Sequence, residues 1–187
     1  MSNAALERTI SNLIRLGIVA EVEGAMCRIE SGELLTDLLP WLSATAGDHI
    51  AWSPATVGEQ VVLLCPDGDL ANAIALRGLY SDQFPTPDVS PHRSVQRFPD
   101  GAVIAYDSDS HALDATLPQG GAITLTADGG LTINGPVKIS GDTAITGAVS
   151  ITGSAEVTED VVAGGISLKQ HTHGAVQPGS GHSGPPA

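Results

Sequence analysis

The feature that most constrains this chain is an alternating pattern that holds from residue 122 to residue 164. Eleven of the twelve Ile, Leu and Val residues in this segment occupy odd-numbered positions, and only Val162 occupies an even one. Successive side chains of an extended chain point to opposite faces, so a period of two held this long gives one continuous apolar face. Glycine adds a period of six, which indicates short strands that turn at each glycine. It stands at positions 129, 135, 141, 147 and 153, is replaced by Glu159, and returns at 165.

A single chain has too little material to bury this face by itself. About 45 residues of small side chains give few coils, and no aromatic residue follows Tyr106 to close a single-chain β-helix. Three chains wound together, each forming one wall of a triangular prism, would bury it. At roughly 1.5–3 kcal/mol for each fully buried aliphatic side chain, the stripe would contribute tens of kcal/mol before chain entropy is counted. The repeat therefore predicts an intertwined triple-stranded β-helix in a homotrimer, which is a stiff rod.

The N-terminal half has a different composition. All six arginines precede residue 98, whereas 15 of the 22 glycines follow residue 97. Leu6, Ile10 and Leu13 at helical spacing predict a short helix over residues 1–17, with Gly17 capping its end. Runs of apolar residues separated by turn signals predict five strands, the number in a small OB-type barrel over residues 18–82. The expected strands are 18–23, 26–29, 34–39, 60–65 and 73–79.

The remaining segments complete an all-β architecture with one short helix. The Pro-rich residues 83–96 have the composition of a linker. Further strands over residues 97–165 lead into the shaft, and residues 166–187 form an apex rich in Gly, Pro and His.

Composition excludes several classes of function. A net charge of −13, from 21 acidic and 8 basic residues, argues against nucleic acid as a partner. No apolar run is long enough to span a membrane, and no signal-peptide pattern opens the chain. Cys27 and Cys65 are expected to be small buried residues in a reducing compartment rather than a disulfide. Asp107, Asp109 and Asp114 flank His111 without a nucleophile or phosphate loop, so we expect no enzyme.

Two histidines near the C-terminus continue the odd parity of the repeat. His171 and His173 lie one strand step apart, so three chains would place six imidazoles around the threefold axis. Six nitrogens suit an octahedral divalent transition ion such as iron or nickel, with one ion per trimer, whereas structural zinc prefers four ligands. The alternative is that these histidines belong to a polar tail.

Glu159 occupies an inward position where a glycine was due. A trimer would bring three of its carboxylates towards one axis, and buried like charges need a proton, a cation or access to water. A second cation such as calcium is one interpretation, and a change of register that turns Glu159 outward is the other. His182 lacks the inward parity and is expected in solvent or at a cap. The isolated His49, His92 and His111 are expected at the surface.

Several strings along nearly the whole chain resemble the baseplate assembly protein V family, the central spike of contractile phage tails and R-type pyocins. The strings Val57-Gly58-Glu59-Gln60-Val61 and Arg97-Phe98-Pro99-Asp100-Gly101 are fairly specific, and His171-Thr172-His173 is specific by its position. The others are residues 12–19, 37–42, 79–81 and 102–104.

The resemblance implies a homotrimer with an OB-fold base, a β-helix shaft and a pointed apex. The base would join the baseplate hub protein, and His171 and His173 of three chains would hold an iron ion in the tip. Such a spike sits at the baseplate tip of a virion or tail particle, is assembled in the bacterial cytoplasm, and pierces the target's outer membrane when the sheath contracts. A trimeric receptor-binding fibre for surface glycan or lipopolysaccharide is the alternative, although sugar-binding tips usually present aromatic residues. A trimeric metalloenzyme with an open coordination position is a third class.

Overall fold

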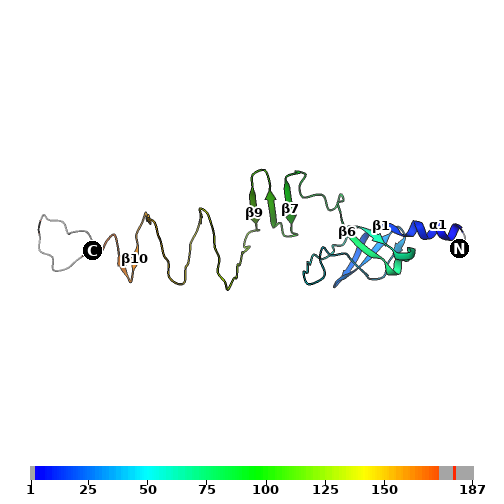
Figure 1. Cartoon of the computed structure of the whole chain (residues 1–187), viewed down its shortest axis with the longest axis horizontal. Helices are drawn as coiled ribbons and strands as arrows, with labels where there is room; N and C mark the ends of the chain where they lie inside the picture. Colours follow the sequence, from blue (N-terminus) through cyan, green and yellow to red (C-terminus); the bar gives the residue numbers. More distant parts are fainter. Residues whose placement is uncertain (1–2, 173–178, 180–187) are drawn as a thin grey trace. The chain divides into compact units, whose positions relative to one another are not determined.

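The computed structural model describes residues 3–172 and residue 179. The chain divides into two compact units, Met1–Leu125 and Thr126–Ala187. The first unit contains one α-helix, two 3₁₀ helices (Pro66–Gly68 and Leu70–Asn72), a barrel and a three-stranded sheet. The second contains an extended repeat and a short hairpin (Figure 1). No helix of the described residues is long and apolar enough to cross a membrane.

The N-terminal helix is shorter than the sequence predicted. Helix α1 spans Asn3–Asn12, and strand β1 (Ile14–Glu23) begins two residues later. The prediction that Gly17 caps the helix is therefore wrong, because Gly17 lies inside β1 and pairs with Val61 of β5 (Gln60–Leu64). A side chain at this position would collide with Cγ2 of Ile29. Close packing of β1 on the core, rather than a helix end, requires glycine here.

The barrel is an antiparallel sheet in the order β3-β2-β1-β5-β6. Its other strands are β2 (Met26–Ser31), β3 (Leu34–Leu35), β4 (Leu39–Pro40) and β6 (Ile74–Leu79). Strand β4 pairs with β2, and a bridge between Trp41 and Ala75 joins the end of β4 to β6, which closes the sheet on itself. The predicted strand 34–39 is divided in two because Thr36 is buried and its hydroxyl accepts the backbone N–H of Ile29.

Alternate residues of these strands meet in one hydrophobic core. Cys27 and Cys65 are free thiols inside it, as the sequence predicted, and burial raises the pKa of both. A buried, protonated thiol packs as a small hydrophobic residue. The core consists of Val19, Cys27, Ile29, Leu39, Ala55, Val61, Leu63, Cys65, Ala73 and Ala75.

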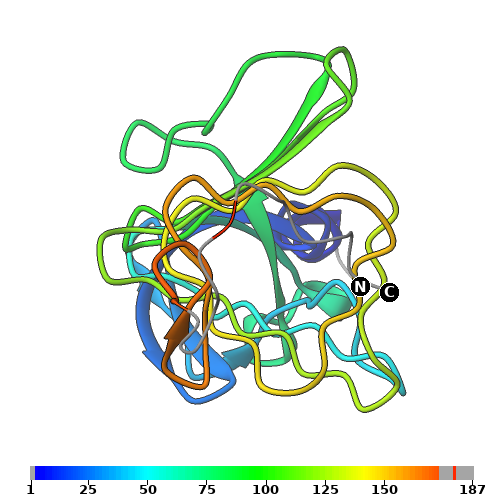
Figure 2. The same cartoon turned by 90° about the vertical axis from the view of Figure 1, so that its left-hand side faces the viewer.

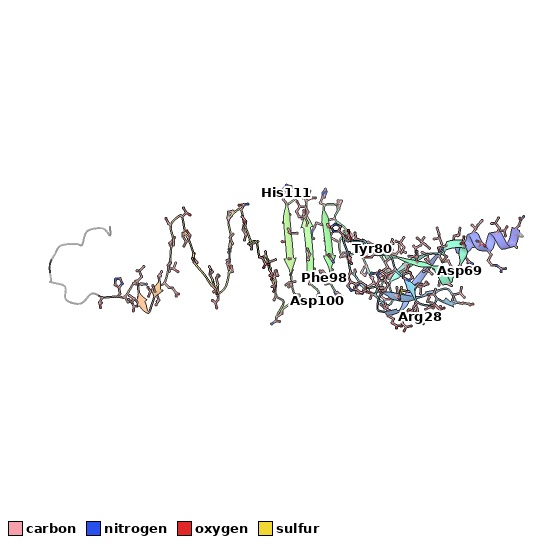
Figure 3. All side chains as sticks on the ribbon, turned by 60° about the horizontal axis from the view of Figure 1, so that its bottom comes forward. Arg28, Asp69, Tyr80, Phe98, Asp100 and His111 are labelled. Atoms are coloured by element: carbon pink, nitrogen blue, oxygen red, sulfur yellow. The ribbon has the colours of Figure 1, made fainter. Side chains whose placement is uncertain are left out.

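A separate three-stranded antiparallel sheet follows the barrel in the first unit. It contains β7 (Arg93–Arg97), β8 (Val103–Asp107) and β9 (Ala112–Thr116). Residues 93–96, which the sequence assigned to a linker, form most of β7 because they pair with β8 along its whole length. Figure 3 shows His111 at one end of this sheet and Phe98 and Asp100 at the other.

The β7–β8 turn explains one of the specific sequence strings. The Asp100 carboxylate accepts the backbone N–H of Ala102 at 3.0 Å, and Gly101 has a positive φ of 91°. The backbone N–H of Phe98 donates to the carbonyl of Ala102 at 2.8 Å and closes the turn. The sequence Pro99-Asp100-Gly101 thus supplies the turn chemistry that this hairpin needs.

The repeat of the second unit winds as extended segments that change direction at bends (Figures 1 and 2). Its residues up to 161 are all described, and none of them belongs to a strand within this chain. Gly135, Gly141 and Gly147, spaced by six residues, have φ values of 148°, 124° and 129°. Other residues rarely adopt these φ values, so glycine stands where the chain bends.

Candidate functional site

A short hairpin carries the chain towards the predicted metal ligands. Strands β10 (Val162–Ala163) and β11 (Ile166–Ser167) are joined by Gly164 and Gly165, whose φ values are 59° and 83°. Two consecutive positive φ angles are typical of a tight two-residue hairpin turn. The backbone N–H of Leu168 donates to the carbonyl of Val161 at 2.8 Å and extends the pairing by one step.

Asp160 braces the open end of this hairpin. Its Oδ1 atom accepts the backbone N–H of Val161 at 2.9 Å and that of Lys169 at 3.0 Å. A hydrogen bond from the Ser167 side chain, together with the N–H of Lys169, lowers the pKa of the Asp160 carboxyl. An ionised carboxylate therefore ties the strand before the turn to the segment after it.

His171 lies at the end of this braced segment. Its backbone N–H donates to the carbonyl of Ser167 at 3.1 Å. Its ring Nδ1 lies 3.0 Å from the same carbonyl oxygen and 3.1 Å from that of Leu168. Because a carbonyl oxygen only accepts hydrogen bonds, Nδ1 carries a proton, and Nε2 is the ring nitrogen that could ligate a metal. This tautomer, with a backbone carbonyl behind it, is the usual form of a metal-ligating histidine.

The chemistry of His171 therefore fits a divalent transition ion. Its predicted companion His173 lies outside the described residues, as does His182, so the pairing itself stays a prediction. Within the described part of one chain, no group of three or more His, Cys, Asp or Glu residues is arranged to hold a metal. Glu159 is exposed in the described chain, beside the bracing Asp160.

His92, His111 and the neighbouring Asp107 and Asp109 have local structural roles. Nδ1 of His92 lies 3.4 Å from Oδ1 of Asp109. Asp107 Oδ1 accepts the backbone N–H groups of Asp109 and Ser110 at 2.9 and 3.2 Å, which shapes the β8–β9 turn. His111, at a positive φ of 54°, completes this turn.

The barrel presents a surface that the sequence analysis missed. On β1, β5 and β6 the outward-facing residues of the paired rows are apolar except for Gln60, and the buried inward-facing residues are apolar too. They form three cross-strand rows, and apolar side chains exposed together on a sheet face mark an interaction surface. The signal was present in the even positions of β1, but Ile14 and Leu16 were assigned to the helix and only Ile18 to a strand. The rows are Ile14–Leu64–Ile74, Leu16–Val62–Leu76 and Ile18–Gln60–Leu79.

Two protein families match the two ends of this architecture. The family described as the Type VI secretion system/phage-baseplate injector OB domain matches residues 15–80, and the GpV Apex motif matches residues 165–187. The closed barrel and the segment that follows β10 thus match the two domain families found in phage baseplate spikes. The family named by resemblance and the OB fold of the barrel are confirmed.

A particular relative supports the same assignment. The "Spike protein" of Escherichia phage P2 is 40% identical over 129 residues. The alignment covers 65% of this chain and 61% of the relative, so the chain matches about three fifths of that protein's length. The family is one of structural spike proteins.

Proposed function

We propose that this chain forms the central spike of a contractile-tail baseplate, as a homotrimer that pierces the target's outer membrane. One observation carries the proposal. All eleven odd-position aliphatic residues between 122 and 164 are exposed in the single chain, at 42–75% of their full area. A regular apolar stripe that its own chain leaves uncovered calls for other copies of the same chain.

The shaft follows from winding three such stripes together. Positive φ at Gly135, Gly141 and Gly147 lets each chain change direction every six residues, which suits a triangular cross-section. The outward Thr, Ser, Asp and Glu residues keep the rod soluble and discourage edge-to-edge aggregation. Intertwined chains resist local opening, because one strand cannot leave without breaking its pairing with two partners.

The outward apolar face of β1, β5 and β6 is the surface that we propose for the hub protein of the baseplate. Ile14 and Leu16 are 66% and 71% exposed, so covering them would remove substantial apolar area from water. Leu16→Glu places a charge in the middle row of this face. We expect the variant to form trimers and to fail in assembly with the hub. Loss of the trimer instead would assign the face to contacts between copies.

The apex is proposed to hold one iron ion per trimer through His171 and His173 of three chains. The contacts of His171 Nδ1 with two backbone carbonyl oxygens support this, because they make Nε2 the ring nitrogen that would ligate a metal. When bound, the ion would cross-link three chain ends, which are otherwise the places where fraying starts. Glu159 is proposed as a second cation site, for calcium, lower on the axis. Calcium should then raise the melting temperature of the wild type more than that of Glu159→Gln.

The mechanism is mechanical. The sheath supplies the work, and the spike supplies a narrow, rigid point whose apolar residues are turned inward. As part of the baseplate tip, the chain would be a component of the virion tail, assembled in the bacterial cytoplasm.

The first test is the mass and metal content of the untagged protein. We expect a species of three times the chain mass of 19.0 kDa, with about one iron for every three chains. A monomer at micromolar concentration would overturn the spike, and a trimer without metal would overturn the apex ion alone. Tail particles carrying shaft-disrupted variants should contract without killing target cells. A receptor-binding fibre would instead show saturable binding to isolated lipopolysaccharide.

A further inference from the structure

We propose that Asp160 and Ser167 are positioning residues for the apex metal: they brace a hairpin that presents His171 with Nε2 as its ligating atom. The inference rests on the metal site proposed above. It adds that contacts within one chain already orient His171 for metal binding.

The first step is the orientation of the ring. Both hydrogen-bonding groups of His171 that face the hairpin, the backbone N–H and ring Nδ1, point at the carbonyl oxygen of Ser167, at 3.1 and 3.0 Å. A second carbonyl, of Leu168, lies 3.1 Å from Nδ1. The ring is therefore held in one tautomer by two acceptors of its own chain. Acceptors of this kind behind a ligating histidine also increase its basicity towards a metal.

The second step is what holds the Ser167 carbonyl in place. The ladder between β10 and β11 contains only two residue pairs, Val162–Ser167 and Ala163–Ile166. A two-stranded hairpin this short is not stable on its own. The two glycines of its turn also lose more conformational entropy than other residues when the hairpin forms. Pairing alone is therefore insufficient to fix the position of Ser167.

The third step is the brace. The Asp160 carboxylate receives the backbone N–H of Lys169 at 3.0 Å, and the nearby Ser167 side chain is the largest cause of the lowered pKa of Asp160. The Ser167 hydroxyl oxygen also accepts the backbone N–H of Gln170 at 2.8 Å. These contacts hold the segment that contains Ser167 and leads from the hairpin to His171. Charge-assisted hydrogen bonds of this type are stronger than neutral ones.

The experiment compares the wild type with Asp160→Ala and Asp160→Asn in the full chain. Asparagine keeps an acceptor oxygen for the N–H of Lys169, so it should rescue much of what alanine loses. Asp142→Ala, an exposed acidic position of the repeat outside the hairpin, is the matched control. Sedimentation first establishes that all four proteins are trimers, so that differences report on the apex.

Two readouts follow. The first is the rate at which iron passes to a chelator, where we expect a loss roughly ten- to a hundredfold faster in Asp160→Ala, the usual cost of removing a supporting group. The second is the ¹⁵N chemical shift of the His171 ring in metal-free protein. The wild type should show the Nδ1–H form, and Asp160→Ala a mixture of both tautomers.

The outcomes separate this inference from the proposed function. If the wild type holds iron and Asp160→Ala loses it no faster than Asp142→Ala, the positioning role is wrong and the metal site stands. If the wild type holds no iron, both fail. If Asp160→Ala releases iron faster while the ring stays Nδ1–H, the brace acts on the hairpin without setting the tautomer, and the proposal as stated is overturned.

Discussion

Arg77 of β6 places its Nε atom 2.9 and 3.0 Å from the two carboxylate oxygens of Glu59, just before β5. The two side chains are only 19% and 14% exposed, and the guanidinium carbon lies 6.0 Å from the centre of the Trp41 ring. Glu59 also accepts the backbone N–H of Thr56 at 3.1 Å. This pair fixes the loop before β5 against β6, and it explains the Glu in the string Val57-Gly58-Glu59-Gln60-Val61.

Glu59→Gln should destabilise the barrel by about 2 kcal/mol, because it leaves a largely buried guanidinium without its charged partner. Both tryptophans, Trp41 and Trp52, lie in the barrel with ring centres 5.7 Å apart, so tryptophan fluorescence during urea unfolding follows this domain. Glu21→Gln is the control. Glu21 pairs with Arg28 at 3.0 Å but is 58% exposed, so its loss should cost under about 1 kcal/mol. Equal costs for the two variants would contradict the role given to Glu59.

Gly17→Ala should destabilise the barrel by about 1–3 kcal/mol, the usual range for overpacking. The new methyl group would collide with Cγ2 of Ile29 and lie 3.0 Å from the carbonyl oxygen of Glu30. Gly47→Ala is the matched control, since nothing lies within 4 Å of a methyl group there. Both are measured by the same fluorescence transition. A Gly17→Ala barrel as stable as the wild type would show that β1 can shift away from β2.

Ile145→Asp should abolish or strongly weaken the trimer, because three chains would bring three carboxylates into the apolar axis of the shaft. Thr146→Asp, one residue further on the outward face, should leave the trimer intact. The measurement is the fraction of trimer by sedimentation over a dilution series. Equal effects of the two substitutions would rule out the alternation as the basis of assembly.

The β8–β9 turn should loosen only in acid. Backbone N–H groups of Ser110 and Asp109, with a smaller contribution from Arg93, hold the pKa of the Asp107 carboxyl below its ordinary value of 3.8. A group whose folded pKa is depressed stabilises the fold above its unfolded pKa, and that contribution disappears as the pH falls through the folded pKa. The turn should therefore be unchanged from neutral pH to about pH 4 and weaken below 3.8.

An NMR titration of the Asp107 side-chain carbon measures this directly. A midpoint at or above 3.8 would contradict the stabilising role of the turn. Asp107→Asn keeps the acceptor oxygen and cannot ionise in this range, so its turn should lose the acid dependence.

Local signals in the sequence were sufficient to predict the fold class of this protein and most of its barrel strands. Periods of two and six are properties of neighbouring residues, so they predicted an all-β chain and glycine reversals at 135, 141 and 147, where φ is positive. Turn residues located most barrel strands to within a residue or two, and family strings identified the OB domain and the apex. Parity along the chain also predicts that His171 faces inward, which stays a prediction.

Contacts between residues far apart in the sequence determine the features that local signals did not predict. Ile14 pairs with Leu64 across 50 positions, and that ladder, rather than local helix propensity, determines that α1 ends at Asn12. The ion pair of Glu59 with Arg77 and the apolar rows on the outer face of the barrel exist only once β1, β5 and β6 lie side by side. The tautomer of His171 depends likewise on where the hairpin places the Ser167 carbonyl. Sequence periodicity reports which face a residue takes, whereas the partner on that face is chosen by packing in three dimensions.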